Sequence, residues 1–170
     1  MAETEEKARP LTAGEIALAR RAFGDELLYD RIRLRRGAGM NAAAAIAFMR
    51  GNPAITLSRT IYFKTPWHDD FTAADEKARS DLLHELTHVV QYQRLGLIRF
   101  GLRYARELAA CGFNASRMYH YEKAGRKFPK ATLEGQAQMV GDYILALLRE
   151  DARRSAEVAP WLEGSGFFEF

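Results

Sequence analysis

The chain has 170 residues, of which 48% are hydrophobic and 28% charged, so it is long enough for one domain with a substantial core. The net charge of +3 is modest, and the single cysteine, Cys111, excludes an internal disulfide and a zinc cluster built from thiolates. Residues 1–10 are polar and mixed in charge, and no long apolar run follows them, which predicts a loose leader without a secretory signal or a membrane span. We therefore expect one domain over residues 1–170 that is cytoplasmic unless a non-Sec secretion system exports it.

The first predicted helix begins directly after the leader. Thr12 is placed as an N-cap, and Glu15, three residues later, completes a capping box in front of apolar residues at helical spacing. We expect this helix to end at Gly24. Residues 27–34 then alternate apolar and charged side chains, which predicts a half-buried strand. Four arginines lie in or just after this strand: Arg31, Arg33, Arg35 and Arg36. We interpret them as its solvated face, because no nucleic-acid motif accompanies them.

The middle of the chain is predicted from shorter signals. Residues 41–50 are rich in alanine and fit either a short helix or an irregular apolar loop. After a break at 51–53, two short apolar pieces on either side of 58–59 predict a hairpin. The loop 64–71 holds His68 beside two aspartates, which we interpret as an ordinary acidic segment before a helix and not as a second metal site.

A long helix is predicted over residues 74–94, and it carries one His-Glu-x-x-His unit. Residues four apart lie on the same helix face, so His84 and His88 can offer two imidazole nitrogens to one ion, and two neutral imidazoles suit zinc. Glu85 then lies beside the metal, where it can act as general base on a bound water. Apolar rows on the same helix place the histidines next to a buried face, where an unpaired imidazole would be costly.

The last third of the chain is predicted to be largely helical. After an interruption at Gly96, residues 97–110 form a basic amphipathic helix, which can lie on a membrane but which we expect to pack on the core. Residues 113–128 are aromatic and polar, and a strong helix follows over 133–154. The aromatic tail, 155–170, is expected to be held on the body. Together these elements predict an α+β domain that is mostly helical with a small β-sheet.

Catalytic zinc usually has three protein ligands and one open position, so a third ligand is needed. The remaining histidines, His68 and His120, do not follow the motif at the spacing of a third histidine ligand, which favours a carboxylate from a later helix. There are two candidates. Glu107 lies among arginines, where an exposed ion pair is the ordinary interpretation, and Glu134 opens the last apolar helix.

We favour Glu134 over the alternative. Gly135 and Ala137 beside it are small, which allows its helix to approach the motif helix closely. Gln138 and Asp142, on later turns of the same helix, are expected to hold a ligand histidine through its second ring nitrogen.

Four segments also resemble a known family. Residues 60–63 and the run 82–91 around the histidines resemble the metallopeptidase domain found near extracellular contractile injection systems. Residues 9–20 and 134–137 are closer still to the bacterial Vgr-related proteins in that group. The resemblance covers most of the chain up to Tyr143.

The resemblance implies a zincin-like metallopeptidase domain. In such a domain zinc is held by two histidines and a downstream glutamate, which His84, His88 and Glu134 match here. The sequence departs from that group in carrying no attached toxin, spike or repeat module, so we expect the protein to act alone or as an accessory to a secretion system.

The resulting hypothesis is zinc-dependent hydrolysis of peptide or other amide bonds in a peptide or protein substrate. Glu85 would act as the general base. Tyr119, His120 or Tyr121 would donate a hydrogen bond to the tetrahedral oxyanion.

Two other hypotheses remain open. One is a non-catalytic, zinc-containing accessory or scaffold protein of a secretion or contractile injection system, in which the zinc site is structural or vestigial. A fourth protein ligand such as His68 or His120 in place of water would support it. The other is an enzyme kept inactive by its own tail, with residues 167–170 filling the cleft.

Overall fold

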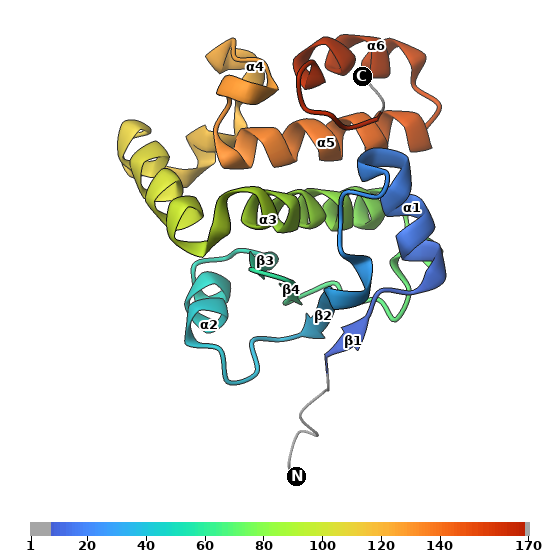
Figure 1. Cartoon of the computed structure of the whole chain (residues 1–170), viewed down its shortest axis with the longest axis vertical. Coiled ribbons are helices and arrows are strands. Elements are labelled where there is room, and N and C mark those ends of the chain that lie inside the picture. Colours follow the sequence, from blue (N-terminus) through green and yellow to red (C-terminus); the bar gives the residue numbers. More distant parts are fainter. Residues whose placement is uncertain (1–7, 169–170) are drawn as a thin grey trace.

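The long helix α3 (Glu76–Ala110) runs through the middle of the molecule, with α5 (Leu133–Leu148) packed along one side and a small sheet on the other. Figure 1 shows this order of layers, and the computed structural model describes residues 8–168. Among the described residues, no helix has the length and apolar composition needed to cross a lipid bilayer. The predicted α+β class, mostly helical with a small sheet, is confirmed.

The sheet has four short strands in the order β1-β2-β4-β3, namely β1 (Arg9–Pro10), β2 (Arg33–Arg36), β4 (Thr60–Phe63) and β3 (Ala54–Leu57). The middle pair, β2 and β4, is parallel, and the outer pairs are antiparallel. Strands β3 and β4 form the predicted hairpin. Because β3 is at the end of this order, one of its edges has no strand partner among the described residues.

The described part also has four shorter α-helices, α1 (Ala13–Phe23), α2 (Ala42–Met49), α4 (Tyr121–Ala124) and α6 (Ala152–Val158). Short 3-10 turns lie at Tyr29–Arg31, Phe71–Ala73, Ala115–Tyr119, Phe128–Lys130 and Ala159–Leu162. Residues 41–50 thus form a helix, which Asn41 caps by accepting a hydrogen bond from the amide of Ala44. The long predicted helix 133–154 is divided into α5 and α6. Glu150, between them, has a positive φ of 54°, and Asp151 then caps α6 through the amide of Arg154.

Glu15 connects the N-terminal elements. Its predicted capping box with Thr12 is present, and its fully buried carboxylate also accepts two hydrogen bonds from Arg9, at 2.8 Å each, and one from the amide of Phe71 at 2.9 Å. The loose leader predicted for residues 1–10 is therefore wrong at its end, since Arg9 and Pro10 form β1. Residues 1–7 lie outside the described residues.

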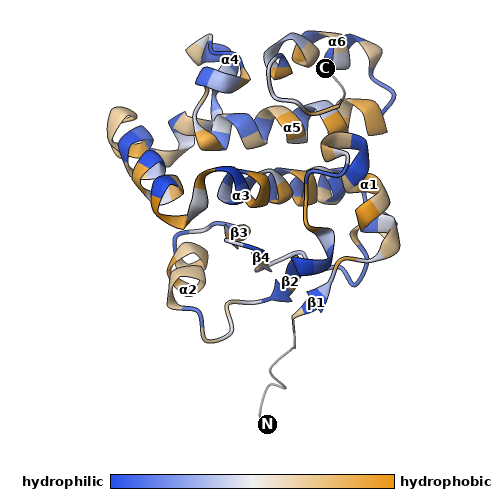
Figure 2. Cartoon of the chain, in the orientation of Figure 1, coloured by the Kyte–Doolittle hydropathy of each residue, from blue (hydrophilic) through white to orange (hydrophobic). Residues whose placement is uncertain are grey.

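Two further expectations are corrected by the structure. The strand predicted over 27–34 is β2, displaced to residues 33–36, because Tyr29–Arg31 form a 3-10 turn fixed by a hydrogen bond from the Tyr29 hydroxyl to the carbonyl of Gly24. The helix 97–110 continues α3 beyond a kink at Gly96 and forms an edge of the molecule (Figure 1). Several of its apolar side chains are exposed, so it does not cover the core as expected. Figure 2 shows hydrophobic residues at intervals along this part of the ribbon.

The tail is held on the body, as predicted. The buried ring of Phe167 packs edge-on against Phe23 and Phe128, with centroid distances of 5.0 and 5.2 Å, and the amide of Phe168 donates to the carbonyl of Ala22. This position places Phe167 in the core and not in the cleft, while residues 169–170 lie outside the described residues.

The contacts of Glu15 predict a large stability effect. Replacement by Gln removes the charge that pairs with Arg9 and leaves part of its hydrogen bonding unsatisfied in a buried place, so we expect Glu15→Gln to lose about 3 kcal/mol of unfolding free energy. Urea denaturation measures this loss. Glu163→Gln, which breaks an ion pair between exposed side chains, is the matched control and should have little effect. Equal stability of the two variants would contradict this role of Glu15.

Candidate metal centre

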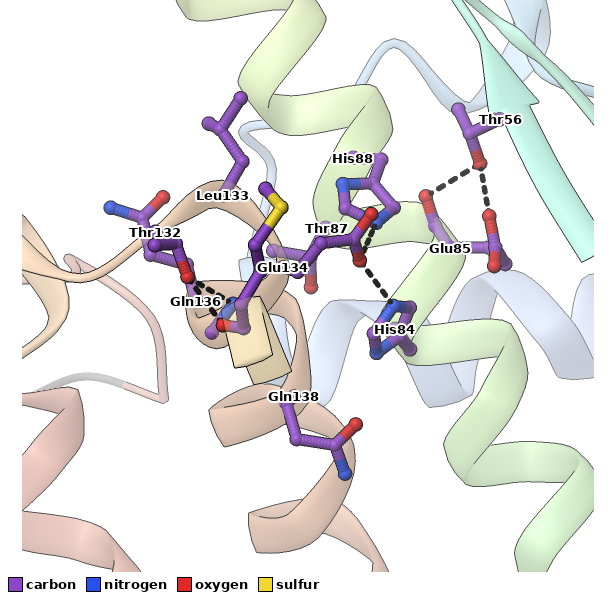
Figure 3. A network of polar contacts seen from close by, with 12 residues as sticks. Thr56, His84, Glu85, Thr87, His88, Thr132, Leu133, Glu134, Gln136 and Gln138 are labelled. Carbon is purple, nitrogen blue, oxygen red and sulfur yellow. Dashed lines mark hydrogen bonds and ion pairs between the residues drawn. The ribbon is translucent and has the colours of Figure 1, made fainter. Parts of the chain in front are cut away.

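Three predicted ligands come together between α3 and α5 (Figure 3). The Oε2 atom of Glu134 lies 3.4 Å from Nε2 of His84 and 3.2 Å from Nε2 of His88. Within residues 8–168 this is the one group of three or more such side chains whose ligand atoms lie within 4.8 Å of one another. His68 is not part of any such group; its ring packs against Phe71.

These distances fit a small tetrahedral cation. Ligand atoms placed about 2.05 Å from a tetrahedral zinc are about 3.3 Å apart, and the two observed separations from Glu134 bracket that value. Two imidazoles and one carboxylate are also a ligand set that zinc accepts. The described residues therefore offer three protein ligands and leave a fourth position without one.

Close packing of the two helices brings the ligands together. The Ser80 hydroxyl of α3 donates to the carbonyl of Gly141 in α5 at 2.8 Å, and a Cβ added at Gly141 would lie 3.2 Å from that hydroxyl oxygen. Gly135, which was expected to permit this approach, instead faces the carbonyl of Met118. Glu134 lies in the first turn of α5, where the helix dipole favours a carboxylate.

The alternative ligand, Glu107, is outside the metal centre but supports it. Its carboxylate accepts a hydrogen bond from Arg103 at 2.7 Å and another from the amide of Leu133, also at 2.7 Å. Thr132 caps the same helix end by accepting from the amide of Gly135. Glu107 thus fixes the start of the helix that carries the predicted third ligand.

Electrostatics in the centre favour positive charge. Burial lowers the pKa of His88, but the Glu134 carboxylate outweighs this and raises the pKa to about 9. Burial raises the pKa of Glu134, but the two histidines outweigh it and hold that pKa well below its usual range. In the metal-free protein, a protonated His88 therefore carries the positive charge that balances the Glu134 carboxylate.

Two glutamines orient His88. Its Nδ1 lies 2.7 Å from Oε1 of Gln91, whose Nε2 donates to the carbonyl of Leu133 at 2.9 Å and to Oε1 of Gln136 at 3.0 Å. The Nε2 of Gln136 donates in turn to the carbonyl of Phe128. Because the Nε2 group of Gln91 faces two acceptors, its Oε1 must be the atom that faces His88. Nδ1 of His88 is therefore the hydrogen-bond donor to Gln91, and Nε2 of His88 is directed at Glu134.

Asp142 and Gln138, which were expected to orient a histidine, make no hydrogen bond to His84 or His88. Asp142 accepts hydrogen bonds from the Tyr121 hydroxyl at 2.9 Å and from Gln138 at 2.7 Å, and Gln138 therefore serves Asp142 and not a histidine. The residues missed by the sequence analysis are Gln91 and Gln136. A signal for the first was present, because Gln91 follows His88 by three residues on the same helix face.

Glu85 lies on the sheet side of the histidines, away from Glu134 (Figure 3). The hydroxyl of Thr56, in the edge strand β3, donates to Oε2 of Glu85 at 2.7 Å and lies 3.1 Å from the backbone oxygen of the same residue. Both side chains are buried. Thr56 therefore couples the edge strand to the predicted general base.

Of the three predicted oxyanion donors, Tyr119 is the one that lies at the centre. Its ring stacks on His84 with centroids 5.9 Å apart, and burial together with the nearby negative charge of Glu134 raises the pKa of its hydroxyl above the usual range. The Tyr121 hydroxyl is bound to Asp142, and His120 is exposed. Tyr119 thus keeps its proton and can donate it in a hydrogen bond.

A cavity of about 250 Å³ adjoins His84, Glu85 and Tyr119. More of its wall is apolar than polar, and most of it comes from the sheet, the loop that follows it and the first turns of α3. Asn52, Thr65, Asp81 and, from α5, Gln138 add polar groups. The apolar lining residues are Pro53, Ala54, Phe63, Pro66, Phe71 and Ala78.

The raised pKa of His88 predicts how the metal-free protein responds to pH. A pKa of about 9 in the folded state, against an ordinary value of 6.5, means that protonation stabilises the fold below pH 6.5 and that this stabilisation is lost as pH rises through 9. Thermal unfolding of chelator-treated protein should show a loss on the order of 2 to 3 kcal/mol over this range. His88→Gln should show no such slope. A stability that stays constant or rises from pH 6.5 to 9 would contradict the prediction.

Two comparisons relate the chain to known proteins. Its structure is similar to the effector domain of Pseudomonas aeruginosa VgrG2b, with a TM-score of 0.67 and 26% sequence identity over 94% of this chain and 84% of that one. A search among curated proteins finds no match. The eCIS core domain family matches residues 10–96, which include His84, Glu85 and His88 but not Glu134. This match spans just over half of the 170 residues of the chain, so the chain belongs to the eCIS core domain family.

Proposed function

We propose that the protein is a zinc-dependent hydrolase of peptide bonds with a zincin-like domain. One observation carries the proposal: His84, His88 and Glu134 converge at separations that suit tetrahedral zinc, with Glu85 and an apolar cavity beside them. Structural zinc sites usually have four protein ligands, whereas this group has three among the described residues. The open fourth position favours catalysis over the scaffold alternative, because neither His68 nor His120 belongs to the group within residues 8–168.

The protein's own residues would share the work as follows. When bound to His84, His88 and Glu134, zinc would act as a Lewis acid toward the scissile carbonyl and would lower the pKa of the attacking water to about 7. Glu85 accepts the proton of the attacking water and passes it to the leaving amine. Tyr119 donates a hydrogen bond to the oxyanion that develops on the carbonyl.

Thr56 gives this arrangement a link to the substrate. It holds one carboxylate oxygen of Glu85, which leaves the other oxygen for the proton transfer. It belongs to β3, the edge strand, and an extended peptide can add to such an edge by main-chain hydrogen bonds. The cavity lined by Phe63, Phe71 and Ala78 would accept an apolar side chain next to the cleaved bond.

The comparisons support a cellular setting for this proposal. Membership of the eCIS core domain family and the similarity to a VgrG2b effector domain favour a bacterial protein that works with a contractile injection system. We propose that it reaches a protein or peptide substrate as an effector or accessory of such a non-Sec system.

The role of Glu85 is tested by Glu85→Gln, which keeps the size of the side chain and removes its basicity. We expect the variant to bind one zinc ion, as wild type does, and to lose activity on a mixed peptide library by at least about a hundredfold. Metal analysis by mass spectrometry and product detection are run side by side. Glu76→Gln, in the first turn of the same helix, is the matched control and should retain activity. Absence of metal from wild type would overturn the proposal, and metal without turnover in wild type would favour the scaffold.

The orientation of His88 is tested by Gln91→Met, which removes the acceptor for Nδ1 at similar volume. We expect zinc affinity, measured by competition with a chelator, to fall by about 10- to 100-fold. Gln93→Met is a matched control, because Gln93 bonds the backbone of Glu26 and Leu28 instead. Equal affinities in the two variants would show that Gln91 does not position the ligand.

A further inference from the structure

The second half of α3, residues 97–110, presents an apolar face to solvent. We call this segment the basic arm. It contacts the body through Phe100, whose buried ring stacks on that of Tyr92 with centroids 3.8 Å apart. It also contacts the body through Glu107, which accepts a hydrogen bond from the amide of Leu133. By helical spacing, Ile98 and Leu102 lie on the opposite side.

The exposure of this outer face is unusual for large apolar side chains. Leu97 is 69% exposed, Ile98 77% and Leu102 63%. Phe113, just beyond the end of the helix, is 78% exposed. Figure 2 shows hydrophobic segments along the arm at the edge of the molecule. An apolar group of this kind, on a helix that already has a face packed on the body, points to a binding surface.

Positive charge surrounds the apolar face. Arg99 and Arg106, seven residues apart and so on one side of the helix, border it, and neither makes an ion pair or hydrogen bond within residues 8–168. Residues 94–130 contain nine Lys or Arg against two acidic residues, a net charge of +7. The rest of the chain, with 16 basic and 20 acidic residues, carries −4, so positive charge is concentrated in this stretch of the sequence, in which Arg94 and Lys127 pair with Glu26 and Glu163 from outside it.

Both acidic residues in that segment are already engaged. Glu107 pairs with Arg103, and Glu122 pairs with Arg154. A partner of the arm therefore meets apolar side chains bordered by free cationic groups. This combination is the one found in helices that lie in the interface of an anionic membrane.

We propose that the basic arm docks on the surface of a membrane that contains anionic lipid. The helix lies parallel to the surface, with Leu97, Ile98 and Leu102 inserted among the acyl chains and the two arginines on lipid phosphates. A second copy of the chain fits less well, because a symmetric contact would bring Arg99 and Arg106 of one arm near the same arginines of the other. The proposal does not depend on the metal centre.

Vesicle sedimentation tests the docking. The full chain is mixed with phosphatidylcholine vesicles with or without phosphatidylglycerol, and we expect it to sediment only with the anionic ones. The double variant Ile98→Ser, Leu102→Ser should lower the partition coefficient by at least about tenfold. Arg99→Gln and Arg106→Gln should each lower it by about fivefold, with less effect at high salt.

Matched controls use exposed residues elsewhere. Ile46→Ser with Met49→Ser removes two apolar side chains from α2, and Arg21→Gln with Arg50→Gln removes two positive charges, one more than either single arginine variant of the arm. Both pairs should partition like wild type, and every variant should keep the wild-type melting temperature.

Three results would overturn the proposal. The first is failure of wild type to bind anionic vesicles. The second is equal binding by wild type and the Ile98/Leu102 variant. The third is a dimer, seen in sedimentation velocity and abolished by the same variant without any vesicle binding, which would assign the face to a second copy of the chain.

Discussion

The interaction on which the rest of the structure depends is the contact of Glu134 with His84 and His88. It joins α3 to α5, the two helices that form the centre of the molecule, through side chains that are costly to bury alone. The negative charge of Glu134 raises the pKa of His88, and the histidines lower the pKa of Glu134. The carboxylate therefore keeps its charge beside a protonated imidazole. Burial of these three polar side chains is thus compatible with a stable core without a bound metal.

Most residues around this contact serve to place it. Gln91 and Gln136 fix the ring of His88, and Glu107 with Thr132 fixes the first turn of α5. On the other side, Thr56 holds Glu85 near the cavity. The two carboxylates of the site therefore differ in environment, since one is locked between histidines and the other is held by a single hydroxyl. That difference matches the separate roles of ligand and general base that we propose.

The sequence predicted best what depends on neighbouring residues. The capping box of α1, the β3-β4 hairpin and the histidine pair on α3 follow from spacings of two to four residues, and all are present. Strand β1 was missed because two residues carry no pattern and pair only with distant β2. The displaced β2 shows that alternation of apolar and charged residues does not separate a strand from a preceding 3-10 turn.

For the part of the site that lies on α5, the sequence predicted the residue that meets the histidines but not the residues that support it. Glu134 was favoured because it opens an apolar helix. The direct partner of His88, Gln91, is on α3 itself, and the rotation of α5 about its axis decides that Gln136, and not Gln138 or Asp142, supports it. The arm was misjudged for a similar reason, since amphipathic spacing defines a face without saying what covers it.

The hydrogen bond from the Leu133 amide to Glu107 has a consequence for how the domain can be divided. Glu107 belongs to the arm, and Leu133 directly precedes Glu134, so one hydrogen bond links the exposed edge of the molecule to the residue before the predicted third ligand. The arm is therefore not a removable module. Evolution or engineering that shortens or exchanges it must supply another acceptor for the start of α5, or the geometry of the centre changes with it.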